Sequence, residues 1–371
     1  MLNVHVVEGP PTEVQTFDED DLAHRLTDHD VEVIREIFRT PLTGSYNWDY
    51  EAANSRIRRL YELGKRFNWN AELDVDWSQA IPADAAAAAA AQEGPEGFAQ
   101  HPKWQKLTPE QKREFAARSQ AQTLSQFLHG EQGALMVASQ LVSCAPTHDA
   151  KLYAASQTFD EARHVEVFHR YLMERCRMIY PINPNLKFLL DKVLTDERWD
   201  LKFIGMQILI EGLALAAFQT IREQTKDPVL RDVLELVMRD EGRHVAFGVN
   251  YLEDWIRALP EEEIEERAQF AYEACVVMRN RLVSTTVAEE FGFTTEEALE
   301  INNASQGGAA FRKFLFERMI PNLKRVGLLT EKIRPKFEEL GVLEFENLQN
   351  DGMIDWATLE APLKKKTGIA A

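Results

Sequence analysis

The chain has 371 residues, 45% of them hydrophobic, which is enough to bury a large core within one or two domains. Its formal net charge of −18 at pH 7 argues against nucleic acid as a partner, because nucleic-acid-binding domains present basic surfaces. The three cysteines are odd in number and form no CxxC pair, so we expect no disulfide framework.

The sequence also bears on cellular location. Its N-terminal residues lack a basic start followed by an apolar run, so we expect no secretory signal. The apolar stretch 203–218 looks too short for a membrane span, and Gln207 and Glu211 make it too polar. Because the cysteine usage favours a reducing compartment, the sequence predicts a cytoplasmic protein with no membrane partner.

Residues 1–100 are expected to form an N-terminal arm, helices and a linker that pack on the rest of the chain. Residues 1–30 are acidic and weakly patterned, which indicates a partly ordered arm. One face of 50–68 is apolar at helical spacing, which predicts a helix. Segment 82–97 combines an alanine run with prolines and glycines, so we expect a surface connection there.

The rest of the chain predicts long helices and no strand. Thr108, Pro109 and Gln111 form a favourable helix start, with the threonine as cap and the proline in the first turn. Pro181 and Pro184 mark a crossover. The expected helices cover 109–143, 147–177, 196–225, 228–257, 261–291, 295–305 and 308–328.

A motif of the form Asp-Glu-x-Arg-His occurs twice, each time with another glutamate thirty residues before its own glutamate. The residues are Glu131, Glu161 and His164 in the first copy and Glu211, Glu241 and His244 in the second. Glu211 lies in one of the most apolar stretches of the chain, where a lone buried carboxylate is unfavourable unless it is paired or binds a metal. A single such motif is usually a solvated helix face, but two matched copies favour a metal site.

The spacing brings these residues to one height. The midpoints of the two glutamate pairs are Pro146 and Lys226, the second beside Asp227 and Pro228, and both are turn signals. In an antiparallel hairpin the paired residues would then lie together, roughly 20 Å from each turn. Packing two hairpins would gather four carboxylates and two imidazoles, the ligand set of a ferritin-like dimetal site.

We therefore predict an all-α protein built on a ferritin-like four-helix bundle with additional flanking helices. The bundle should span 101–260, and helices over 261–371 should complete the same domain. Asp160 and Asp240 are expected to hold the histidine of the opposite hairpin, and Arg163 and Arg243 to brace those aspartates. We expect no catalytic residue beyond these and the six candidate ligands.

The ligand types suit a pair of iron ions. Two ferrous ions carry four positive charges, which four carboxylates balance, and imidazole is a good iron ligand. A mixed manganese–iron centre is also compatible, because the ligand types barely separate the two metals.

These motifs resemble the di-iron carboxylate oxygenases and the ribonucleotide reductase small-subunit superfamily over about 105–260. The pattern is similar to that of the bacterial multicomponent monooxygenases and of the aryl-amine N-oxygenases. Three positions depart from these relatives. Phe168 replaces the radical tyrosine of the reductase, Leu215 the threonine of the multicomponent enzymes, and Val237 an extra histidine of the N-oxygenases.

The resemblance implies an oxidoreductase that activates dioxygen and oxidises an apolar or aromatic small molecule by hydroxylation, N-oxygenation or desaturation. Electrons would come from a ferredoxin or flavin reductase, and we expect a homodimer. The alternatives are an iron-handling protein (a ferroxidase or peroxide scavenger), a radical protein similar to the reductase small subunit, and a scaffold with an inactive centre.

Residues near the candidate ligands are expected to shape a substrate pocket. Phe127 lies about one turn from Glu131 and could line it. The small residues Gly133, Ala134 and Ala214 could leave room for substrate. Trp69 and Trp77 are expected to form a structural cap over the bundle, with a substrate gate as the alternative.

Overall fold

The computed structural model describes residues 13–16, 36–40, 42–50, 54–82, 97–281 and 284–356. Most of the predicted arm and linker therefore lies outside the described residues. Within them the regular secondary structure is helical apart from one short antiparallel pair, β1 (Gln15–Thr16) with β2 (Met178–Ile179). This confirms the predicted all-α class.

The first predicted hairpin consists of α5 (Pro109–Cys144) and α6 (His148–Tyr171), which pack against each other along their length. The predicted helix start is present: the Thr108 hydroxyl accepts from the Gln111 amide at 3.2 Å, and the Gln111 side chain accepts from the Thr108 amide at 2.9 Å. The turn falls between Cys144 and His148, around the predicted Pro146. A π-helical turn, η2 (Leu172–Cys176), extends α6.

The second hairpin has an irregular first arm. It runs through α8 (Trp199–Phe203), a π-helical stretch η3 (Ile204–Ile210) and α9 (Glu211–Gln224), and returns as α10 (Pro228–Ala258). Asp227 caps α10 by accepting from the Val229 amide at 2.9 Å. The wider π-turns end where Glu211 begins α9, and such turns are frequent at functional sites.

The arm Trp199–Gln224 is long and apolar enough to cross a membrane by length and composition. The expectation that this stretch is too short was therefore wrong, because the helix begins before the apolar run and extends beyond it. In this fold 94% of its most apolar window is buried inside the protein, so it serves as the central helix of the core.

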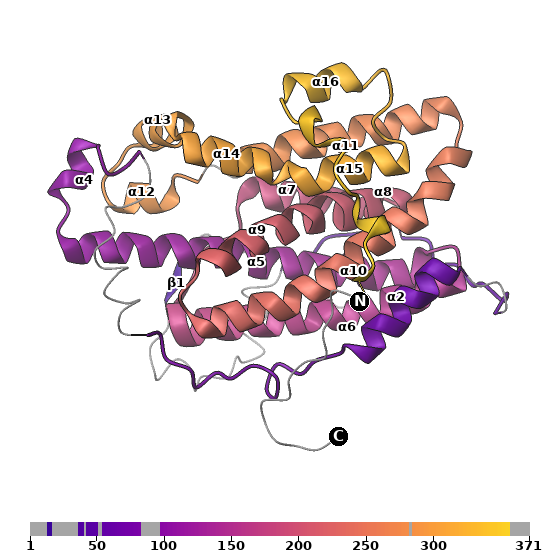
Figure 1. Ribbon diagram of the computed structural model, residues 1–371, viewed down its shortest axis with the longest axis horizontal. Helices are drawn as coiled ribbons and strands as arrows, with labels where there is room; N and C mark the ends of the chain where they lie inside the picture. Colours follow the sequence, from indigo (N-terminus) through magenta and orange to yellow (C-terminus); the bar gives the residue numbers. More distant parts are fainter. Residues whose placement is uncertain are drawn as a thin grey trace, which may run out of the picture.

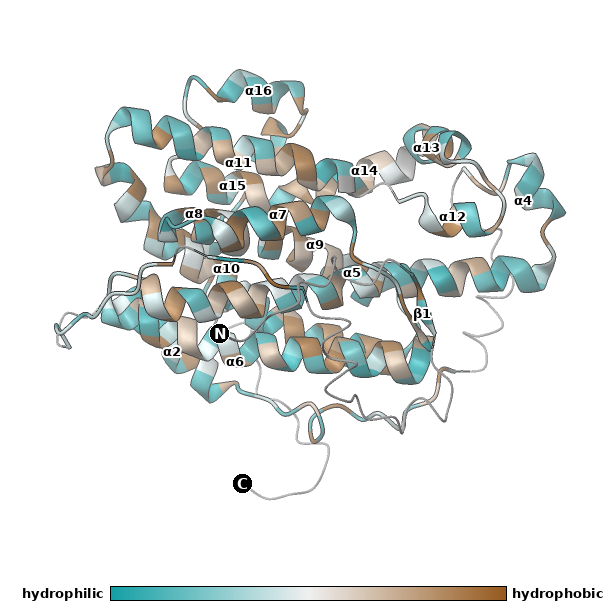
Figure 2. Ribbon diagram, turned by 180° about the vertical axis from the view of Figure 1, so that it is seen from behind, coloured by the Kyte–Doolittle hydropathy of each residue, from teal (hydrophilic) through white to brown (hydrophobic). Residues whose placement is uncertain are grey.

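Flanking helices cover both hairpins. On one side α2 (Ser55–Arg66) packs on α6 and α10, while α11 (Glu261–Arg281) and α15 (Phe316–Val326) cover η3 and α9 (Figure 1). Hydrophobic residues gather along the central helices, whereas outer helices such as α16 are mainly hydrophilic (Figure 2). The remaining elements are α4 (Pro102–Lys106), α12 (Thr286–Glu290), α13 (Thr295–Ala304), α14 (Gln306–Phe314), α16 (Arg334–Glu339), η4 (Leu343–Phe345) and η5 (Asp351–Met353).

The predicted crossover between the hairpins contains a further helix, α7 (Pro184–Thr195). Pro184 occupies its first turn, where no amide donor is needed, and the Asn183 side chain caps it by accepting from the Asn185 amide at 2.9 Å. The sequence indicates only a crossover at Pro184, whereas the structure has a helix that starts there.

A C-terminal strap, residues 351–356, crosses α10 beside the second motif. Buried Asp351 accepts hydrogen bonds from Asn322 at 2.8 Å and Arg318 at 2.7 Å, which anchor the strap to α15. The Trp356 ring lies over Gly242, where an added Cβ would come within 2.2 Å of it. The second motif therefore has glycine where the first has exposed Ala162.

Candidate metal centre

The six predicted ligands converge inside the bundle, each at most 5% exposed. Glu131 comes from α5, Glu161 and His164 from α6, Glu211 from the first turn of α9, and Glu241 and His244 from α10. They form two groups in which the candidate ligand atoms lie within 4.8 Å of one another. The groups are Glu131, Glu161, His164 and Glu241, and Glu161, Glu211 and His244.

Glu161 belongs to both groups, so it is positioned to bridge two metal ions. The Nδ1 atom of His164 lies 3.2 Å from Glu131 and 3.2 Å from Glu161, through one oxygen of each carboxylate. The Nδ1 atom of His244 lies 3.1 Å from the other oxygen of Glu161. Glu241 approaches both imidazoles, at 3.0 Å from His164 and 3.9 Å from His244.

The other imidazole nitrogens make the crossed contacts that the sequence predicts. His164 Nε2 lies 3.1 Å from Asp240 of the opposite hairpin, and His244 Nε2 lies 3.2 Å from Asp160. A carboxylate only accepts hydrogen bonds, so each Nε2 carries a proton and each Nδ1 is the nitrogen that faces the centre and could bind a metal ion.

The two arginines brace these aspartates, as expected. Arg163 pairs with Asp160 on its own helix and donates to Asp240 across the bundle at 3.0 Å. Arg243 pairs with Asp240. All of these groups are buried, so the salt bridges lock the crossed aspartates rigidly in place.

The donor set fits a pair of cations. Each Nδ1 lone pair faces carboxylate oxygens, an arrangement that is repulsive unless a proton or a metal ion lies between them. Glu211 Oε2 is buried and has no hydrogen-bond partner among the described residues. Buried polar atoms are rarely left unsatisfied, and metal ions among these atoms would satisfy them.

Without metal, protons must take that role. Burial raises the pKa of Glu131 and of Glu211 well above the usual value for glutamate. Burial alone would lower the pKa of His164, but its hydrogen bond to Asp240 and the nearby glutamates raise that pKa well above its ordinary value. The surrounding carboxylates likewise overcome burial and raise the pKa of His244.

Sequence reasoning missed Gln157. This fully buried side chain donates through Nε2 to Glu161 at 3.0 Å and to Glu211 at 2.8 Å, so it joins one carboxylate from each hairpin. It lies four residues before Glu161, one turn along the same helix face. The repeat contains a signal for it: Gln157 and Val237 hold the same position in the two copies, and only the first copy has a polar residue there.

Trp69 covers the centre on the side of α2. Its indole nitrogen donates to Asp240 at 2.7 Å, and its ring stacks on His164 with a centroid separation of 6.3 Å. It is 3% exposed, which suits the expected cap. Trp77 lies away from the candidate ligands, where its ring contacts Arg170 and its nitrogen donates to the Ala71 carbonyl at 2.8 Å.

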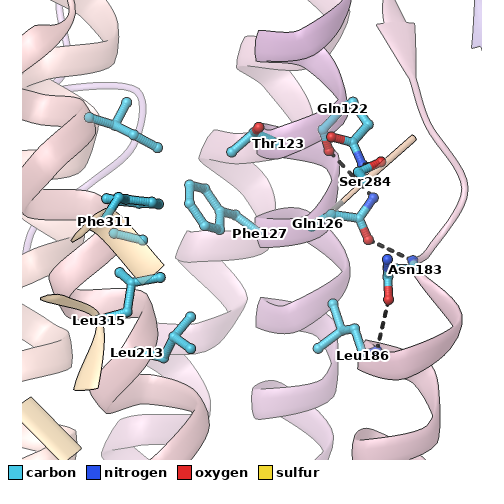
Figure 3. Close-up of a pocket in the computed structure, with 12 residues that line it drawn as sticks. Gln122, Thr123, Gln126, Phe127, Asn183, Leu186, Leu213, Ser284, Phe311 and Leu315 are labelled. Atoms are coloured by element: carbon cyan, nitrogen blue, oxygen red, sulfur yellow. Dashed lines mark hydrogen bonds between the residues drawn. The ribbon is translucent and has the colours of Figure 1, made fainter. Parts of the chain in front are cut away.

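Two neighbouring cavities lie near the candidate ligands. The inner cavity, about 20 Å³, is bordered by Glu131, Glu211 and Glu241 and by the expected pocket residues Phe127, Ala134 and Ala214. The outer cavity, about 140 Å³, shares Gln126 and Phe127 with it (Figure 3). We expected Gly133 to leave room for substrate, but Leu190 of α7 fills that space.

The position of a reductase-type radical tyrosine is apolar here. The Phe168 ring contacts Phe127 at a centroid distance of 5.8 Å and stacks on Phe218 at 5.6 Å. A phenylalanine has no hydroxyl proton to release, so this position cannot store a tyrosyl radical.

Comparison with known proteins gives a family and a fold. Residues 50–327 match the family described as p-aminobenzoate N-oxygenase AurF. Two solved variants of an R2-like ligand-binding oxidase, one with an aerobically and one with an anaerobically reconstituted Mn/Fe cofactor, have TM-scores of 0.50. Their identities are 18% and 19%, over 76% of this chain and 95% and 96% of theirs, a likeness of fold alone. Among curated proteins nothing matches.

Proposed function

This chain belongs to the p-aminobenzoate N-oxygenase AurF family, and from that premise we propose that it is a di-iron monooxygenase acting on an apolar or aromatic small molecule. It is an oxidoreductase with a dimetal centre. Family membership favours N-oxygenation of an aromatic amine, while hydroxylation and desaturation would use the same centre. A cytoplasmic location and a homodimer remain part of the proposal.

One observation carries this proposal most directly: six buried ligand side chains from two hairpins meet in two groups that share Glu161. Glu131 and His164 would complete the first metal position, and Glu211 and His244 the second, with Glu241 beside both. Val237, in place of the extra histidine of aryl-amine N-oxygenases, is fully buried. The proposed site therefore has two imidazoles.

A pair of ferrous ions held there would supply electrons to dioxygen, so that one oxygen atom enters the substrate and the other leaves as water. For an aromatic amine the balance is R–NH₂ + O₂ + 2e⁻ + 2H⁺ → R–NHOH + H₂O. Two electrons per turnover must come from outside the described residues. We include a ferredoxin or flavin reductase as the donor.

The side chains of this protein would hold and shelter that chemistry. Asp160 and Asp240 fix the orientation of the imidazoles, and Gln157 holds Glu161 and Glu211 in place. Trp69 closes the centre on the side of α2. Phe127 adds apolar surface to both cavities beside the centre, which disfavours water there.

The test is product formation by the iron-loaded protein, given a chemical reductant, labelled dioxygen and aniline. We expect phenylhydroxylamine that carries one labelled oxygen atom, detected by mass spectrometry. Glu161→Ala should lose nearly all product, whereas Glu166→Ala, which removes an exposed carboxylate from the same helix, should keep it. The proposal would be contradicted if the wild-type protein oxidised neither aniline nor any other compound in a panel of neutral arenes.

The metal pair can be assigned in the same preparation. We propose iron in both positions, and manganese–iron is the alternative that the ligand types allow. Reconstitution with iron alone and with equal iron and manganese, followed by metal analysis and activity, separates the two. Activity that requires manganese would assign the mixed centre.

A further inference from the structure

The outer cavity adjoins the inner cavity, which borders the candidate metal centre. Phe127 and Gln126 border both cavities, and the inner one touches three of the candidate ligands. In Figure 3 the Phe127 ring points towards Phe311 and Leu315 across the outer cavity. A substrate bound there would lie beside the residues that border the candidate ligands.

The size of this cavity suits one aromatic ring. Its volume is about 140 Å³, and a cavity of this order accommodates benzene. One wall is apolar and includes Leu213, Ala217, Ile221 and Leu315. Such a wall offers the apolar contacts that an aromatic ring requires.

The opposite wall is polar but carries no charge. It includes the side chains of Gln122, Gln126, Asn183 and Ser284. Their hydrogen bonds are largely used within the protein. Gln126 accepts from the Asn183 amide at 2.6 Å and donates to the Pro181 carbonyl at 3.0 Å, and Gln122 donates to Ser284 at 3.0 Å.

Two basic side chains of the described residues that adjoin the lining are engaged elsewhere. Lys187, next to Leu186 of the lining, pairs with Glu36 and Asp191 at 2.9 and 2.6 Å. Arg312, next to Phe311, donates to the Asn302 carbonyl at 3.3 Å. Among the described residues that border either cavity, no side chain is cationic.

This charge pattern selects against an anionic substrate. A carboxylate that enters the cavity loses hydration, and no cationic side chain of the described lining compensates for that loss, which is unfavourable. From the neutral lining we infer that the substrate is an uncharged aromatic amine or similar neutral arene, unlike the carboxylate named for the family. This inference rests on the proposed function and narrows its substrate class.

The test compares two ligands of matched shape, p-aminobenzamide and p-aminobenzoate, which differ in charge at neutral pH. Binding to the diferrous protein is measured by calorimetry without oxygen, so that no turnover is needed. We expect the amide to bind at least about tenfold more tightly, since an unpaired buried charge is disfavoured by more than this. Equal or tighter binding of the benzoate would overturn the inference, as would no binding of either ligand.

A gain-of-function variant makes the test sharper. Ile221→Arg places a cation in the lining at a half-buried position, so it should strengthen p-aminobenzoate binding about tenfold or more and weaken the preference for the amide. Gln219→Arg adds the same charge to the same helix outside the lining and should change neither affinity. Unchanged benzoate binding by folded Ile221→Arg would also overturn the inference.

These outcomes are separate from those of the proposed function. If the diferrous protein oxidises neutral arenes but binds p-aminobenzoate as well as the amide, only the inferred substrate class is wrong. If it binds the amide selectively but gives no oxygenated product from any neutral arene, the proposed activity is wrong and the cavity assignment stands.

Discussion

At the scale of single residues, Gln157 links the two hairpins although it belongs to neither sequence motif. Its amide donates to Glu161 from one hairpin and Glu211 from the other. The Gln157 carbonyl in turn lies 3.5 Å from the Gln207 amide in η3. A neutral donor at this place restrains both carboxylates without changing the charge of the site.

Replacing Gln157 should therefore affect metal binding more than folding. Gln157→Leu removes both hydrogen bonds and should weaken binding of the metal held by Glu211 about 10–100-fold, the usual effect of losing a group that orients a ligand. Anaerobic ferrous titration measures this. The exposed Glu166→Ala serves as control, and unchanged affinity in Gln157→Leu would show that the amide has no positioning role.

Metal uptake should release protons and tighten as pH rises. In the metal-free protein the raised pKa values mean that His164, His244 and Glu211 retain protons that metal must displace. Imidazoles with raised pKa stabilise the metal-free fold at low pH, and this stability is lost as pH rises through the folded-state value. Addition of zinc in weak buffer, followed with a pH-stat, should release protons. Uptake without proton release would contradict this account.

Most of the site could be predicted from the sequence because the chemistry repeats at one spacing. The six candidate ligands and the crossed aspartates follow from two motifs and two turns. Gln157 and the anchoring of Trp69 do not, because each depends on a partner brought close only by tertiary packing. The volume of the pocket could not be predicted either, because Leu190 fills the space beside Gly133 and belongs to α7, a helix that the sequence did not indicate.

At the scale of elements, the helices of the two hairpins were predicted within a few residues and the irregular ones were not. The helix expected over 261–291 was wrong, because α11 ends at Arg281 and α12 follows, and the helix expected over 308–328 is divided into α14 and α15. Helices α5 and α10 have proline in the first turn and a side-chain cap, which mark their starts. The π-helical η3 leaves no mark in the sequence, because all seven of its residues are buried and any helical period would read the same. Helix α7 was not predicted, because Pro184 was interpreted only as part of a crossover.

The contact between the C-terminal strap and α10 predicts a local packing defect. Gly242→Ala would drive a Cβ into the Trp356 ring and should destabilise the protein by about 1–3 kcal/mol. Gly130→Ala is the matched control, because it also adjoins a candidate ligand but its Cβ meets nothing within 4 Å. That control should be neutral or stabilising by about 0.4–1 kcal/mol. Chemical denaturation measures both, and equal stability of the two variants would contradict the packing.

At the scale of the whole molecule, the metals would tie together four helix segments from two hairpins. Binding to the folded state alone should stabilise the protein by about 4 kcal/mol when free metal is a thousandfold above its dissociation constant. Calorimetry without oxygen should thus show a higher melting temperature with ferrous iron and a lower one after chelation. Identical melting curves would mean that the metal does not bind the folded chain.

The central claim is that six side chains of two hairpins hold a coupled pair of metal ions. Anaerobic loading with ⁵⁷Fe, oxygen exposure and Mössbauer spectroscopy test it most directly. The account predicts about two irons per chain, magnetically coupled after oxidation, and loss of most of the second iron in Glu211→Ala. Wild-type protein that takes up no iron, holds only uncoupled ions, or binds no more iron than Glu211→Ala would contradict it.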